Sequence, residues 1–151
     1  MPWPREVIPD SDRLFLRVHI RLLQPSQELH PGIFREHDGS MSVDWERYST
    51  AEESRGRAGE PSANGVVTLV AGEVRSISGL AVEHSPDEER SNRAHSDVLG
   101  ISTPVAPASP IDPVVAMSEG TRKTMVRAKL LDLCNGWIIN PFEQGMSVSG
   151  F

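Results

Sequence analysis

Residues 14–22 read LFLRVHIRL, and this segment supports the clearest structural prediction in the chain. Every even-numbered position is Leu, Val or Ile, while the positions between them are Phe15, Arg17, His19 and Arg21. An apolar period of two is typical of a strand that buries one face. The pattern therefore predicts a strand over 14–22 in which Arg17, His19 and Arg21 share the other face.

Similar apolar or alternating runs follow along the chain and predict further strands, which are bounded by Gly, Pro and polar turns. These runs cover residues 41–45, 66–70, 80–84, 94–99 and 137–139.

Three segments favour helix instead. Thr50 and Glu53 have the spacing of a capping box, which begins a short helix. Residues 71–78 have room for two helical turns, and Gly79 is placed to end them. Residues 121–134 carry an apolar stripe at helical spacing and form the main predicted helix. The sequence thus predicts an α+β fold: a mostly antiparallel sheet of about five strands, one main C-terminal helix, and long loops rich in Pro and Gly.

The length of 151 residues suits one domain. Proline spacing divides it, because closely spaced prolines exclude helix. We expect an extended N-terminal arm (1–13), an α+β core (14–101), a Pro/Ala-rich tether (102–117), a helix and strand packing on the core (118–141), and a tail (142–151).

Composition restricts the function classes. The net charge is −6, so the chain lacks the overall basic character of a general nucleic-acid binder. Cys134 is the only cysteine, which excludes an internal disulfide and fits a reducing compartment. Neither a secretory signal nor an apolar run of membrane-spanning length is present. We expect a cytoplasmic protein that does not interact with membranes.

Five residues are candidates for one site. His19, His84 and His95 lie on or beside predicted strands, and imidazole exchanges protons near neutral pH. Arg17 could stabilise an anion beside them, and Asn92 could orient a substrate. The alternative is that the three histidines are packed or hydrogen-bonded strand residues with no shared site.

Common catalytic and cofactor templates are absent. The sequence has no phosphate-binding loop, dinucleotide-binding fingerprint, nucleophile elbow or zinc-ligand spacing. We therefore predict no cofactor, and binding of a divalent metal by the histidines ranks last among the hypotheses. Cys134 lies on the apolar stripe of its helix, which favours a small core residue over a nucleophile.

The C-terminal segment is the only basic one, owing to Arg122, Lys123, Arg127 and Lys129 in the main predicted helix. Two of these cations lie in its first turn, where the helix dipole disfavours positive charge. The four residues are predicted to bind an acidic protein partner or a phosphate. The alternative is a solvated face that aids solubility.

Three blocks of residues occur in order along the chain. The first is IPDSD at 8–12, followed by Leu14-Phe15, Arg17 and His19. The second is MSVD at 41–44, and the third consists of His84, Pro86, Asn92, Ala94, His95 and Gly100. Together they resemble a group of small bacterial proteins described mainly as hypothetical. The resemblance covers about residues 8–100 and implies no activity. It favours treating the five candidates as one constellation, although the group tends to have proline where this chain has Ile20.

Two function hypotheses follow. The first is an accessory or protein-interaction subunit of a bacterial operon-encoded system, such as one of defence or stress response, that binds a partner from the same operon. The second is a small His-dependent hydrolase or transferase, nuclease-like or toxin-like, that acts on a phosphate-containing substrate. In it His19 and either His84 or His95 exchange protons while Arg17 holds the anion. Nucleic acid is expected to contact at most the basic helix over 121–134.

Overall fold

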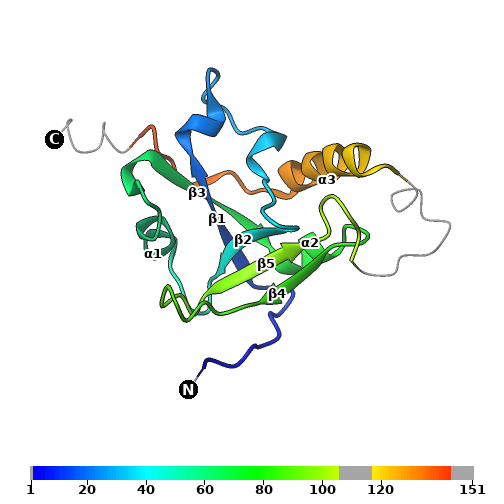
Figure 1. Cartoon of the computed structure of the whole chain (residues 1–151). Helices are drawn as coiled ribbons and strands as arrows, with labels where there is room; N and C mark the ends of the chain where they lie inside the picture. The colour runs from blue at the N-terminus through cyan, green and yellow to red at the C-terminus, as the bar shows by residue number, and fades with distance from the viewer. Residues whose placement is uncertain (1, 106–116, 144–151) are drawn as a thin grey trace.

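The computed structural model describes residues 2–105 and 117–143. Within them the chain forms a six-stranded sheet, one strand more than the predicted five, in which every neighbouring pair is antiparallel (Figure 1). The order across the sheet is β4-β5-β2-β1-β3-β6. The strands are β1 (Arg13–His19), β2 (Ser40–Trp45), β3 (Asn64–Val70), β4 (Ala81–His84), β5 (His95–Leu99) and β6 (Trp137–Ile139). The predicted α+β fold is confirmed.

The helices described are α1 (Ala51–Gly56), α2 (Ala71–Arg75) and the main C-terminal helix α3 (Glu119–Leu133), together with the 3-10 turns η1 (Ile20–Leu23), η2 (Pro31–Ile33) and η3 (Pro61–Ala63). The capping box of α1 is present: the Thr50 hydroxyl accepts from the Glu53 N–H, and the Glu53 carboxylate accepts from the Thr50 N–H. The hydrogen bond from the Thr50 backbone N–H is the main cause that lowers the pKa of the Glu53 carboxyl group. Helix α2 is shorter than predicted because it ends at Arg75, although Gly79 does adopt a φ of +84°.

Strand β1 follows the alternation of its sequence but ends at His19, three residues earlier than predicted. The reason is local: the Nδ1 atom of His19 accepts a hydrogen bond from the Arg21 backbone N–H at 3.0 Å, which caps the turn η1. Arg17 and His19 therefore share the polar face of β1, whereas Arg21 lies outside the strand.

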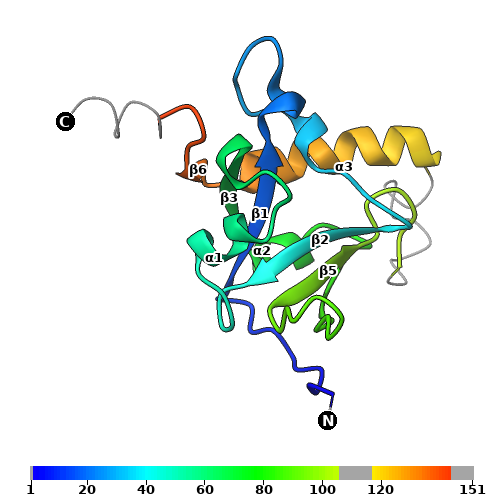
Figure 2. The same cartoon turned by 60° about the vertical axis from the view of Figure 1, so that its left-hand side comes forward.

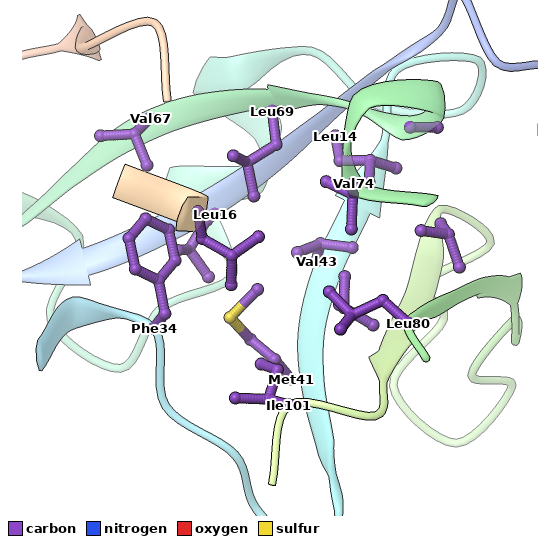
Figure 3. Close-up of a cluster of buried hydrophobic side chains, with 14 of the residues drawn as sticks. Leu14, Leu16, Phe34, Met41, Val43, Val67, Leu69, Val74, Leu80 and Ile101 are labelled. Atoms are coloured by element: carbon purple, nitrogen blue, oxygen red, sulfur yellow. The ribbon is translucent and has the colours of Figure 1, made fainter. Parts of the chain in front are cut away.

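The apolar face of the sheet forms the core. In Figure 2, α3 crosses behind β1, and both α2 and α3 contact β3 on this side. Figure 3 shows side chains from β1, β2 and β3 gathered against others from the loops and α2; the labelled ones are Leu14, Leu16, Phe34, Met41, Val43, Val67, Leu69, Val74, Leu80 and Ile101. Val126 and Leu130 of α3 complete the cluster. Burial of this face leaves the opposite face of β1 and β2 to the polar side chains.

The ends of the chain bear little on the site. The first residues extend away from the body (Figure 1), and Ile8 anchors the arm with 1% exposure. Most of the predicted tether (106–116) and most of the predicted tail (144–151) lie outside the described residues. In the described parts, no helix combines the length and the apolar character needed to cross a bilayer.

Candidate functional site

A buried carboxylate organises the polar face of the sheet. Asp44 lies in β2 between Phe15 of β1 and His95 of β5, in register with both. Its side chain is only 3% exposed. Because β2 alternates, Ser42 and Asp44 share this face while Met41 and Val43 enter the core.

The Asp44 carboxylate accepts hydrogen bonds from four side chains. Its Oδ2 atom lies 2.6 Å from Ser54 Oγ, 3.1 Å from Arg17 Nη1 and 3.0 Å from Arg57 Nη1. Its Oδ1 atom accepts from Asn92 Nδ2 at 2.8 Å. A buried carboxylate needs such donors because burial removes its hydration. The arrangement holds two guanidinium groups side by side against one negative charge.

Helix α1 supplies part of this network. It packs on the polar face of β1, where the Ser54 carbonyl accepts from Arg17 Nη1 at 2.8 Å. Arg57 follows the last residue of α1, and its Nη1 atom also donates to Ser49 Oγ at 2.9 Å. The Thr50 cap that begins α1 thus fixes the position from which Ser54 and Arg57 reach Asp44.

The loop between β4 and β5 closes one side of the site. The backbones of Asp87 and Asn92 exchange two hydrogen bonds, of 2.9 and 2.8 Å, which form a tight loop. Within it the Asp87 carboxylate accepts from the backbone N–H of Arg90, and this bond, aided by the Arg90 guanidinium, lowers the pKa of Asp87. The Asn92 side chain is held at both ends, since its Oδ1 atom accepts from the Ala94 N–H.

His95 has a defined tautomer when neutral. Its Nδ1 atom lies 2.7 Å from the Ser85 carbonyl oxygen. A carbonyl oxygen only accepts, so Nδ1 carries the proton and Nε2 keeps its lone pair. The Nε2 atom lies 3.2 Å from Ser42 Oγ and 3.8 Å from Asp97 Oδ1. The lone pair therefore faces a hydroxyl group.

These groups line a cleft of about 410 Å³, formed by Arg17, Ser42, Arg57, Asp87, Arg90, Asn92 and His95. Three of the lining side chains are guanidinium groups. Three carboxylates lie near them: Asp87 in the lining, Asp44 beneath it and Asp97 beside His95. Several guanidinium N–H donors held in one cleft suit an anionic ligand.

The structure brings together three of the five predicted site residues: Arg17, Asn92 and His95. His19 shares the face of Arg17 but lies at the end of β1, where its Nε2 atom is 3.2 Å from Glu60 Oε1, and it does not line the cleft. His84 is on the other face of the sheet. Its strand partner is Ser96, and neighbouring residues such as His95 and Ser96 point to opposite faces.

His84 instead belongs to a buried aromatic cluster. It is 2% exposed and packs on Trp45 and Tyr48, with ring centroids 5.0 and 5.8 Å away. Its Nδ1 atom accepts from the Glu6 N–H at 3.0 Å, so Nε2 donates to the Arg93 carbonyl oxygen at 2.7 Å. The predicted convergence of three histidines is therefore not found, and for His84 the packed, hydrogen-bonded alternative describes the structure.

Of the four cations of α3 that were predicted to bind a partner, Arg122 is buried, so the prediction is wrong for this residue. Arg122 is 1% exposed, and its guanidinium donates to the carbonyl oxygens of Gly100 and Ser78. It joins α3 to two loops of the core and cannot face a partner. Lys129 is exposed, while Lys123 and Arg127 are partly buried.

Several residues of the cleft were not among the predicted site residues. Ser42 and Asp44 could have been found, because the alternation of β2 places them on one polar face. Arg57, Asp87 and Arg90 lie in turns and loops of charged sequence, where no periodic signal separates a site residue from a solvated one.

In the two described ranges, no three His, Cys, Asp or Glu side chains gather as a potential metal site. Comparisons of the chain with protein-family models, with curated proteins and with solved structures give no match.

Proposed function

We propose that the protein is a small hydrolase or transferase that binds a phosphate-containing substrate in the cleft and uses His95 to transfer protons. The observation that carries the proposal is the pair of guanidinium groups held by Asp44 in the same cleft as His95. This is the second of the two functions considered from the sequence, and the geometry supports it better than the first.

The phosphate preference follows from the donors. Guanidinium groups match the tetrahedral oxygens of phosphate by paired hydrogen bonds, and they remain charged at any physiological pH. Arg17 and Arg57 are 30% and 26% exposed, so each keeps part of its group open to the cleft while Asp44 fixes its position. Arg90, at 85% exposure, adds a cation at the rim.

The role of His95 follows from its orientation. The Ser85 carbonyl fixes the ring, and Nε2 is left to accept a proton inside the cleft. A positioned base within hydrogen-bond reach of a hydroxyl group is the arrangement that general acid–base catalysis needs. Asn92, held by Asp44 and the Ala94 N–H, forms part of the wall against which the substrate is oriented.

Binding of inorganic phosphate and pyrophosphate, measured by calorimetry and by the shift in unfolding temperature, tests the proposal. We expect both anions to bind and to stabilise the protein by mass action. Arg90→Met should weaken binding about fivefold, the effect of about 1 kcal/mol that an exposed charge contributes. Arg35→Met is the matched control because Arg35 is exposed and does not line the cleft. Equal affinities for the wild type and both variants, or no binding at all, would contradict the proposal.

The accessory-subunit hypothesis is the second candidate, and two exposed apolar side chains favour it. Val7 of the N-terminal arm is 87% exposed, and Ile138 of the edge strand β6 is 43% exposed. A protein partner could cover such positions, and an edge strand offers unpaired backbone groups for pairing.

A cytoplasmic location is part of the proposal under either function. Co-expression with the neighbouring genes tests the accessory-subunit hypothesis, which loses its support if the chain purifies alone as a monomer.

A further inference from the structure

We infer that Ser42 is the nucleophile of the cleft and forms a covalent phosphoseryl intermediate. The inference rests on the proposed function, because it assigns the attacking atom for that reaction. Ser42 Oγ lies 3.2 Å from His95 Nε2, within hydrogen-bond reach. Since Nδ1 carries the ring proton in the neutral tautomer, the Ser42 hydroxyl is the donor in this bond.

Three groups stand in the order that an activated serine requires: a hydroxyl, a base beside it, and an acceptor that orients the base. Here they are the Ser42 hydroxyl, the His95 imidazole and the Ser85 carbonyl oxygen. The backbone carbonyl takes the place that a carboxylate often has. Asp97 adds a negative charge beside the ring, with Oδ1 3.8 Å from Nε2.

The strands hold this pair rigidly. Ser42 in β2 is directly opposite Asp97 in β5, and His95 is the diagonal neighbour two residues along β5. Diagonal neighbours on one face of a sheet lie within reach of a long side chain. Ser42 is exposed, so its oxygen is open to the cleft, and two residues further along β2 Asp44 holds Arg17 and Arg57 where a bound phosphate group would lie.

The reaction needs water as its only co-reactant. Ser42 Oγ attacks phosphorus and passes its proton to His95 Nε2, while the bond from phosphorus to the leaving oxygen breaks. The protonated His95 then donates that proton to the leaving oxygen. Water next attacks the phosphoseryl group and gives a proton to His95, the bond from phosphorus to Oγ breaks, and Oγ recovers a proton from Nε2. The arginines neutralise the negative charge that builds up on the phosphoryl oxygens.

An alkyl fluorophosphonate is a suitable probe, because a serine nucleophile displaces its fluoride and keeps the phosphonyl group. We expect intact-mass spectrometry to show one adduct on the wild-type protein, and peptide mapping to place it on Ser42. Ser42→Ala should abolish labelling, and His95→Gln should slow it by about 100-fold, the lower end of what a general base contributes. Ser40→Ala is the matched control, since Ser40 lies on the same face of β2 but has no contact with His95, and it should label at the wild-type rate.

An adduct elsewhere, labelling that survives Ser42→Ala, or no adduct on the wild type would overturn the inference. Calorimetric titration of the same proteins with phosphate separates this failure from failure of the proposed function. If phosphate binds but Ser42 is not labelled, only the nucleophile is wrong. If phosphate does not bind, the proposed function fails whatever the labelling shows. Ser42 is exposed, so folding of Ser42→Ala, checked by circular dichroism, should match that of the wild type.

Discussion

Replacing Asp44 by asparagine is the most informative perturbation of the fold and the cleft together. The change keeps the shape of the side chain but replaces one carboxylate oxygen with an amide NH₂ group. All four partners of Asp44 donate hydrogen bonds to it. Either orientation of the new amide therefore sets a donor against a donor in a site that is 3% exposed.

The size of the effect follows from the less costly orientation. In that orientation the amide oxygen takes the position of Oδ2 and still accepts from Arg17, Ser54 and Arg57. The NH₂ group takes the position of Oδ1 and faces the Asn92 NH₂ group. Losing one buried hydrogen bond costs about 1–2 kcal/mol. The bond from Ser54 becomes a neutral one, and the two bonds from the arginines, which stay charged, lose their anionic acceptor. Because Arg17 and Arg57 are partly exposed, solvent screens the lost charge attraction, which adds little to the cost. We expect a loss of about 3 kcal/mol in the free energy of unfolding.

Urea denaturation followed by tryptophan fluorescence measures this loss, since Trp45 adjoins Asp44 in β2 and is buried. Asp38→Asn is the control: Asp38 is 92% exposed, and we expect a change below about 0.5 kcal/mol. The same Asp44→Asn protein should bind phosphate more weakly because Arg17 and Arg57 lose their anchor. Wild-type stability in Asp44→Asn would refute the view that this carboxylate organises the cleft.

Three further substitutions test the packing around the site. Arg122→Met should destabilise the protein by about 3 kcal/mol, because the buried guanidinium group no longer donates to the Gly100 and Ser78 carbonyl oxygens. Lys129→Met on the exposed surface of the same helix should be nearly neutral, and equal effects of the two changes in chemical denaturation would show that Arg122 is not structural. Thr50→Ala removes the cap of α1 and should cost about 1 kcal/mol by the same measurement. Leu130→Ala creates a cavity at a fully buried position and should lower the free energy of unfolding by about 3 kcal/mol. The control Val7→Ala, at an exposed position, should lower it by less than about 0.5 kcal/mol. A small loss in Leu130→Ala would mean that α3 does not seal the core.

The strands could be predicted because each one carries a local signal. Alternation in 14–22 and 41–45 encodes one buried and one polar face, and the sheet places both segments with those faces as expected. The capping box at Thr50 is likewise a short-range pattern, and both of its hydrogen bonds form. Strand ends were harder: β1 stops at His19 because a side chain caps the next turn, which periodicity does not encode.

The site could be predicted only in part, since it depends on strand order. The order of β4 and β5 along the chain does not reveal on which face of the sheet each histidine lies. His84 pairs with Ser96, the neighbour of His95, so the two histidines point to opposite faces. Burial of Arg122 was missed for a similar reason. Its partners, the Gly100 and Ser78 carbonyls, come from loops distant in sequence, so a cation in a basic helix gave no sign of a structural role.

The central claim is that phosphate binds between the Asp44-held arginines and His95. A titration with inorganic phosphate, followed by NMR of ¹⁵N-labelled protein, tests it directly by reporting on each N–H group. The account predicts that the largest shifts fall on the Arg57 Nε–H, the Asn92 side-chain amide and the Ser42 backbone amide, all saturating with one affinity. Shifts centred on α3 instead, or none at millimolar phosphate, would contradict it.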